Sequence, residues 1–343
     1  MTSPRVPAID LVKGCAILWV LRIHAHPPAA NYDRLFLYVV NQAVPVFVVL
    51  FGLNSELWWR RHEGAPAAEW YASRARRILV PMWAALPVWW ALALVLRPEH
   101  VSLTRTLPLQ HAMGWLSRVG TGWFITMLLQ LVAVLPLLHA AARRAGSGVV
   151  LAGGLACTLA CEHFRFGLLE MLVGVGPGSG QTQDFFNYWV FSPRFLAHVA
   201  FGMWLAPRVE QLGRMAGLLG AVGFGACVAG AEGLAGAWLA PYAGALVPLP
   251  LTLLLLALFR LLPRARGITP VLEWLGQNSY GLYLGQLLTH NAFVFALGLA
   301  LYERLNLWLY TALLLAGGLF FVWLGETFRR AARGAVTAPG LAH

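Results

Sequence analysis

The chain contains 343 residues, of which 59% are apolar and only 11% are charged, and its mean hydropathy is +0.66. Soluble proteins carry about 25% charged residues, so this composition excludes an ordinary soluble domain and indicates a polytopic membrane protein. The net charge of +11 comes from short basic clusters between apolar segments, which is typical of membrane topology and not of a nucleic-acid-binding surface.

Ten apolar segments approach or exceed the roughly 20 residues that a membrane-spanning helix needs. They predict an all-α membrane protein, a polytopic bundle of about ten transmembrane helices. The segments are 8–26, 35–55, 78–96, 122–142, 149–168, 194–207, 215–234, 238–259, 274–299 and 306–326. Little sequence remains between them, so we expect a single transmembrane domain at 1–333 and a short disordered C-terminal tail at 334–343.

The arginines predict the topology. If the N-terminus is cytoplasmic, the inner segments contain about twice as many arginines as the outer ones, as the positive-inside rule requires. We therefore expect a multi-pass protein of the cell (plasma) membrane with both termini in the cytoplasm. The charged residues that interrupt the first apolar run also argue against a signal peptide. The oligomeric state stays open.

The first predicted helix carries three ionisable residues, Asp10, Lys13 and His24. Such groups are costly at membrane depth and mark a functional site when they face the protein interior. Lys13 and His24 are eleven residues apart, so they project on nearly the same face about 16 Å from one another. Asp10 and Lys13 are three residues apart and are expected to form an ion pair. In the alternative interpretation, His24 merely ends the helix at the membrane surface.

A basic cluster precedes the third predicted helix, in a segment at 57–77 that we expect to be a cytoplasmic loop. Arg74 and Arg77 share a face if the segment is helical, and guanidinium groups bind phosphates with two hydrogen bonds. The alternative is that topology and anionic lipids alone account for these arginines. Two further long loops, at 97–121 and 169–193, are expected outside, and the chain shows no internal repeat of the kind found in many transporters.

The four cysteines, Cys15, Cys157, Cys161 and Cys227, lie in apolar segments without a CxxC pair or a Cys/His ligand set. We expect them to be packing residues and predict no metal site. The buried or interfacial polar residues His198, Glu162, Glu170 and Glu232 are interpreted as structural, without an assigned partner.

Five segments in order resemble the membrane-bound acyltransferase 3 family, whose members O-acylate cell-envelope sugars, lipids and secreted natural products. The opening segment 5–24 is similar to the first helix of the family, where a basic residue is followed by ten residues and a histidine. The other similar segments are 44–52, the basic motif at 74–81, the aromatic pair Trp123 and Phe124, and 275–284.

Three positions depart from the family pattern. Lys13 stands where arginine is usual, which keeps the charge and loses the planar fork. Phe51 replaces a common serine, so a polar contact is missing. Gln286 occupies a position where histidine is common, and it can form hydrogen bonds but cannot titrate. His290 lies one turn further along the same face, so either residue could take the role of the family histidine.

The resemblance implies an enzyme that transfers an acyl group, with acetyl as the expected one, from cytosolic acyl-CoA to a hydroxyl of a sugar, glycan, lipid or secreted metabolite. No bound cofactor is expected, because acetyl-CoA is a co-substrate. His24 would be the catalytic base, the Asp10–Lys13 ion pair would orient the helix or contact the donor arm, and Arg74 and Arg77 would bind donor phosphates. The remaining residues expected in the pocket, where simple packing is the alternative, are Trp123, Ser279, Tyr280, Tyr283 and Gln286.

Two other functions remain open from the sequence. A glycan or lipid transporter or flippase could use the same buried charges as a translocation path. A structural or sensory membrane protein would need none of these residues. The expected partners are acyl-CoA, a hydroxyl-bearing acceptor and membrane lipids, and no nucleic acid.

Overall fold

A computed structural model describes residues 6–25, 33–96, 123–173, 191–261, 267–297 and 306–337. All secondary structure in these ranges is helical, so the predicted all-α class is confirmed. Most of the loops expected at 97–121 and 169–193, and the end of the expected tail, lie outside the described residues.

The helices coincide with the apolar segments of the sequence, with two changes. The α-helices are α1 (Pro7–Ala25), α2 (Arg34–Tyr38), α3 (Ala43–Arg61), α4 (Ala67–Arg74), α5 (Val80–Leu96), α7 (Trp123–Ala145), α8 (Ser147–Val173), α10 (Leu196–Leu205), α11 (Arg214–Ala231), α12 (Ala240–Leu246), α13 (Pro248–Leu261), α14 (Ile268–Gln277), α15 (Ser279–Leu297) and α17 (Leu307–Thr337). Short 3₁₀ helices are η1 (Val40–Gln42), η5 (Ser192–Phe195), η6 (Ala206–Gln211) and η7 (Ala237–Leu239), and η2 (Ala75–Leu79) is a π-helix.

Two expectations about these segments were wrong in detail. The segment 57–77 is not a loop, because α3 continues to Arg61 and α4 and η2 follow after a short turn. The ninth expected span, 274–299, is divided at Asn278 into the end of α14 and the start of α15. Asn278 adopts a non-helical conformation, with its side-chain amide donating to the carbonyl of Trp274, and so caps α14.

The count of ten spans is not confirmed. Within the described residues, five helices are long and apolar enough to cross a membrane, and a bent pair formed by residues 237–246 and 248–261 raises this number to six. The remaining helices are shorter or more polar: α10 has ten residues, and α1 contains Asp10, Lys13 and Arg22. The chain is therefore a helical membrane protein.

The apolar outer surface supports this conclusion. On α11, the exposed large side chains Met215, Leu218, Leu219 and Val222 follow helical spacing and form one continuous apolar face. An exposed apolar face of this kind is stable in lipid and would be a liability in water.

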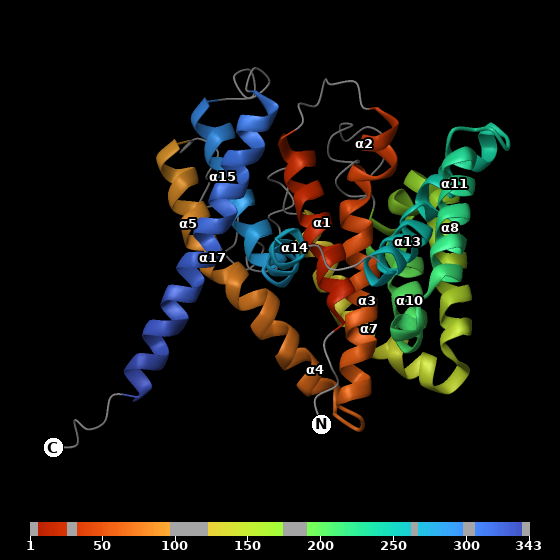
Figure 1. Ribbon diagram of the computed structural model, residues 1–343, viewed down its shortest axis with the longest axis horizontal. Coiled ribbons are helices and arrows are strands. Elements are labelled where there is room, and N and C mark those ends of the chain that lie inside the picture. Colours follow the sequence, from red (N-terminus) through yellow and green to blue (C-terminus); the bar gives the residue numbers. More distant parts are fainter. Residues whose placement is uncertain are drawn as a thin grey trace.

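Helix α1 lies in the middle of the bundle, between α5, α15 and α17 on one side and α8, α10, α11 and α13 on the other (Figure 1). It packs mainly against α14 and α3, while α3 packs against α10 and α15 against α17. The start of α1, helix α4 and the end of α17 all lie at the lower end of the view in Figure 1. The central position of α1 brings its ionisable residues between elements that are far apart in sequence.

Glycines allow the closest helix contacts. A Cβ atom on Gly276 of α14 would collide with the backbone carbonyl of Asp10 on α1, and one on Gly14 would collide with that of Leu272. Small residues at such crossings let helix backbones approach within the membrane, where apolar surface alone gives no preference for protein over lipid. The Gly14–Gly276 crossing therefore fixes where α14 meets α1.

Candidate functional site

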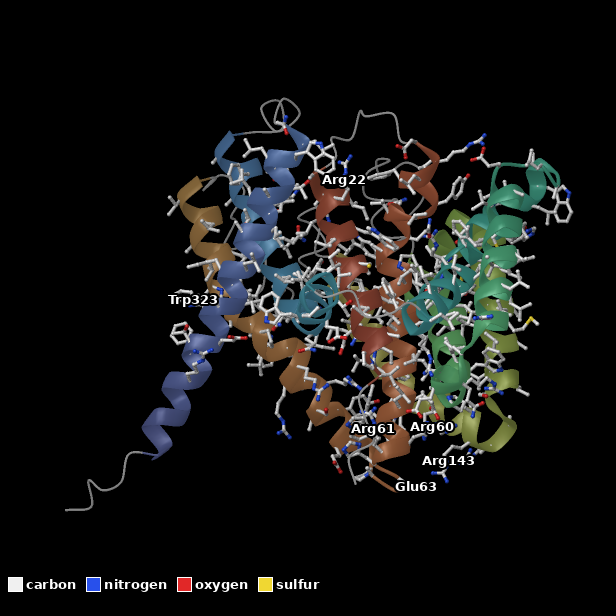
Figure 2. The ribbon with its side chains drawn as sticks, in the orientation of Figure 1. Arg22, Arg60, Arg61, Glu63, Arg143 and Trp323 are labelled. Carbon is white, nitrogen blue, oxygen red and sulfur yellow. The ribbon has the colours of Figure 1, made fainter. Side chains whose placement is uncertain are left out.

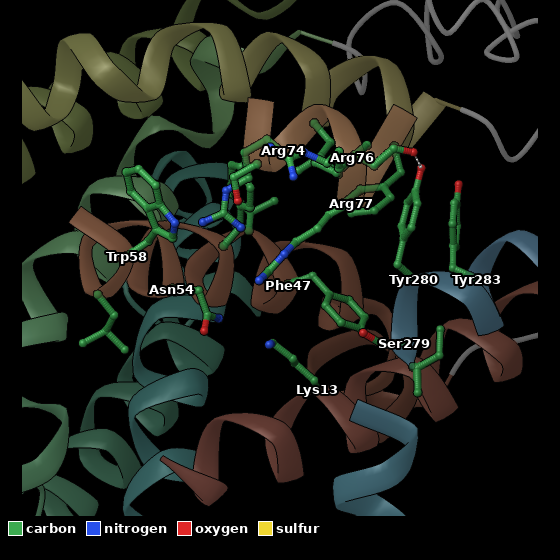
Figure 3. Close-up of a pocket in the computed structure, with 18 of the residues that line it drawn as sticks. Lys13, Phe47, Asn54, Trp58, Arg74, Arg76, Arg77, Ser279, Tyr280 and Tyr283 are labelled. Atoms are coloured by element: carbon green, nitrogen blue, oxygen red, sulfur yellow. Dashed lines mark hydrogen bonds between the residues drawn. The ribbon is translucent and has the colours of Figure 1, made fainter. Parts of the chain in front are cut away.

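A cavity of about 660 Å³ lies between α1, α3, α4, η2, α7 and α15 (Figure 3). Figure 3 shows the arginines of α4 and η2 along one wall, Lys13 opposite them, and the side chains of α15 at one end. Of the residues expected from sequence to form a site, those that line it are Lys13, Arg74, Arg77, Ser279, Tyr280 and Tyr283.

The charge in this cavity is strongly positive. Among the residues that the structure describes, the cavity is lined by one carboxylate, that of Glu69, and by five cationic side chains, those of Lys13, Arg61, Arg74, Arg76 and Arg77. Convergent guanidinium groups provide forked donors for phosphate oxygens, so the wall suits an anion with several phosphates.

The segment η2, which follows α4 directly, is a π-helix that contains Arg76 and Arg77. Single π-helical turns are rare and occur frequently at functional sites. The hydroxyl of Tyr280 on α15 donates a hydrogen bond of 3.1 Å to the carbonyl oxygen of Ile78 (Figure 3). This bond joins the arginine segment directly to the wall of the cavity formed by α15.

Arg74 is held by aromatic rings. Its side chain is buried, and its guanidinium carbon lies 4.0 Å from the ring centre of Trp70 and 5.9 Å from that of Phe51. Burial, followed by the charge of Arg77, lowers the pKa of Arg74 to about 10, which leaves the group charged near neutral pH. Phe51, which stands where a serine is usual in the family, thus provides a ring face to this arginine and lines the cavity.

The expected ion pair of α1 is present. Lys13 Nζ lies 3.6 Å from Asp10 Oδ1, and Asp10 is 3% exposed while the Lys13 ammonium reaches the cavity. A buried carboxylate requires such a partner. Asp10 therefore orients Lys13 and does not itself line the cavity.

His24 does not line the cavity and lies in a second group of polar residues, formed with Gln286, His290 and Tyr310. Its Nδ1 is 3.0 Å from Oε1 of Gln286, which is fully buried on α15. The ring of His290 lies 5.7 Å from the His24 ring, and His290 Nδ1 is hydrogen-bonded at 3.0 Å to the hydroxyl of Tyr310 on α17. Both residues considered for the family histidine position, Gln286 and His290, are thus neighbours of His24.

His24 and Gln286 lie about one helical turn away from the nearest lining residues of the basic cavity. Val20 and Tyr283 line the cavity, while His24 follows Val20 by four residues on α1 and Gln286 follows Tyr283 by three on α15. One turn of an α-helix rises about 5.4 Å. His24 and Gln286 therefore lie about one helical turn beyond the cavity lining at Val20 and Tyr283.

Trp123 was expected in the pocket, but it does not line the cavity. It packs edge-to-face on Phe124, which does line it.

The sequence analysis also did not identify the face of α3 that lines the cavity. The lining residues Phe47, Phe51, Asn54, Trp58 and Arg61 recur at helical spacing, and this periodicity was the available signal.

Two acidic residues without an assigned partner have one in the structure. Glu162 pairs with Arg194 at 2.7 Å, and Glu232 pairs with Arg34 at 3.0 Å. None of these four residues lines the basic cavity, which agrees with the structural role expected for the two glutamates.

A family model described as an acyltransferase domain matches residues 6–326. The match covers most of the chain, including α1, the basic cavity, α15 and the His24 group. Searches of curated proteins and of solved structures found no significant match. The chain therefore belongs to the acyltransferase 3 family and is a membrane acyltransferase.

Proposed function

We propose that this acyltransferase transfers an acyl group, with acetyl as the expected one, from cytosolic acyl-CoA to a hydroxyl of a sugar, glycan, lipid or secreted metabolite. The observation that carries the proposal is one cavity whose basic wall leads to a point one helical turn from His24. The wall matches the phosphates of coenzyme A, and the uncharged lining near Val20 and Tyr283 matches an extended thioester arm.

The proposed donor enters from the end of the bundle that carries exposed arginines. Arg60, Arg61 and Arg143 are at the lower end of the molecule in Figure 2, whereas Arg22 is at the upper end. An excess of basic residues favours the cytoplasmic side, where acyl-CoA is found. The same orientation supports cytoplasmic termini, and the proposal places this multi-pass protein in the plasma membrane.

The hydrogen bond to Gln286 supports a role for each nitrogen of His24. Because a carboxamide oxygen only accepts, the proposed mechanism has the hydrogen of His24 on Nδ1 and the lone pair on Nε2. In the proposed reaction, Nε2 takes the proton of the acceptor hydroxyl while the hydroxyl oxygen attacks the thioester carbonyl carbon. The carbon–sulfur bond then breaks, and the departing thiolate takes the proton from His24 to give CoA thiol and the acyl ester.

Donor binding is tested with purified protein and acetyl-CoA by isothermal titration calorimetry. We expect Arg74→Ala/Arg77→Ala to weaken binding at least about tenfold, because each lost phosphate contact contributes more than 1 kcal/mol. Arg143→Ala is the matched control, since Arg143 is a basic residue of α7 that does not line the cavity. Equal affinity of the double variant and the wild type would overturn the donor-site assignment.

Acyl transfer is tested by mass spectrometry of glycans, lipids and secreted metabolites from cells that express wild-type protein or His24→Ala. We expect one acceptor to lose an acyl mass in cells with the variant, which should still insert and bind acetyl-CoA. A substrate that crosses the membrane without gaining an acyl group would instead identify a transporter.

A further inference from the structure

Gln286 is a buried amide with only one of its two ends engaged. Its side chain is fully buried, and its oxygen accepts the hydrogen bond from His24. Its nitrogen Nε2, which carries two N–H donors, has no hydrogen-bond partner among the described residues. Buried amide donors are nearly always satisfied, so this nitrogen is a donor available to an acceptor that a ligand supplies.

Packing does not explain glutamine at this position. Gln286 is fully buried, and a methionine would fill a similar volume there without a polar group. Thr289 on the same helix satisfies its own hydroxyl by donating to the carbonyl of Gly285, 2.9 Å away. Gln286 Nε2 has no such local solution.

The orientation of the amide is linked to the state of His24. If Nε2 pointed to Nδ1 of His24, that nitrogen would have to accept, and the other ring nitrogen would carry the hydrogen and could not serve as a base. The observed orientation, with Oε1 toward His24, is the one that keeps His24 basic. It also directs the two N–H donors of Gln286 away from the ring.

We infer that Gln286 donates a hydrogen bond from Nε2 to the carbonyl oxygen of the acyl thioester while its Oε1 holds His24. This inference rests on the proposed acyl transfer. When the acceptor oxygen bonds to the carbonyl carbon, the electron pair of the C=O π bond moves to the oxygen, and Gln286 stabilises that negative charge until the C–S bond breaks. One planar amide thereby sets the position of the base relative to the oxyanion.

The test compares two stable acetyl-CoA analogues, so it does not require the acceptor to be known. S-acetonyl-CoA presents an unhydrated ketone, and S-trifluoroacetonyl-CoA presents a hydrated, tetrahedral carbon that resembles the intermediate. Wild-type protein in nanodiscs should bind the fluoroketone more tightly than the ketone. A donor specific for the oxyanion is expected to account for at least about a tenfold preference.

Two variants separate the roles of the amide. Gln286→Met removes both the acceptor oxygen and the donor nitrogen of the amide. Gln286→Glu retains an oxygen that can accept from His24 Nδ1 and removes the N–H donors. Both should lose the preference for the fluoroketone and should bind unmodified CoA as the wild type does, which also reports correct folding. Asn291→Leu is the matched control, because the buried amide nitrogen of Asn291 also has no partner among the described residues, while Asn291 lies five residues along α15 and so projects from another side of the helix.

The outcomes distinguish the inference from the proposed function. A wild-type protein that does not bind CoA overturns the proposed function. A wild-type protein that binds CoA but shows no preference for the fluoroketone overturns the role of Gln286 alone. The same conclusion follows if Gln286→Glu or Gln286→Met keeps the wild-type preference.

Discussion

Tyr280 and Ile78 are 202 positions apart in sequence and are joined by a hydrogen bond of 3.1 Å from a hydroxyl to a backbone carbonyl. Both residues line the basic cavity. The bond therefore connects the arginines of η2 to α15, the helix that also carries Gln286 beside His24.

Tyr280→Phe is expected to lower the free energy of unfolding by about 1 kcal/mol, because it removes one hydrogen bond and keeps the ring. It should also weaken acetyl-CoA binding severalfold, since η2 loses an anchor next to Arg77. Denaturant unfolding in detergent and calorimetry measure the two effects. Thr252→Val, which removes a buried hydroxyl bond of 2.7 Å on α13, should reduce stability without changing CoA affinity. Unchanged CoA affinity in Tyr280→Phe would contradict the anchoring role.

Lys13→Met should destabilise the protein by about 3 kcal/mol, because it removes the cation 3.6 Å from the buried carboxylate of Asp10. The double variant Asp10→Asn/Lys13→Met should lose less than the sum of the two single variants. A double-mutant cycle of unfolding free energies measures this coupling. Simple additivity would show that the ion pair contributes nothing.

Gly276→Ala should destabilise the protein by about 1–3 kcal/mol, because the added methyl group would collide with the backbone of Asp10 at the α1–α14 crossing. Gly153→Ala on α8 is the control, since a Cβ there meets no atom within 4 Å. That substitution should leave stability unchanged or raise it by up to about 1 kcal/mol. A thermal shift in detergent distinguishes the two, and equal melting temperatures would argue against the close crossing.

Arg74→Lys should weaken acetyl-CoA binding about tenfold although the charge is kept, because lysine lacks the planar fork and the stacking on Trp70. Arg60→Lys, at an exposed arginine that does not line the cavity, should have no effect. Arg74 has a lowered pKa of about 10, so its cationic form is lost as the pH rises through that value. The affinity of the wild type should therefore decline toward pH 10, and a steady affinity there would argue against a charged contact from Arg74.

The sequence predicted the apolar segments and the separate groups of polar residues well. Hydrophobic length located the long helices but not α4 and η2, and the spacing of Asp10 and Lys13 predicted their ion pair. It did not predict the π-helical turn at η2 or the break at Asn278. The π-helical turn is held by a tertiary contact, the hydrogen bond from Tyr280 to Ile78, which local propensity does not encode, whereas the break at Asn278 coincides with a local side-chain cap.

By itself, the sequence determined that this protein is a helical membrane protein, that His24 and the basic cluster before α5 are its unusual residues, and that their order resembles one acyltransferase family. Only the tertiary structure decided that Gln286 lies against His24, 262 positions away, and that five cations share one cavity. The reason is physical. Helical periodicity defines the faces of each segment, but in a membrane many apolar faces are equivalent, and glycine crossings and buried hydrogen bonds select which of them meet.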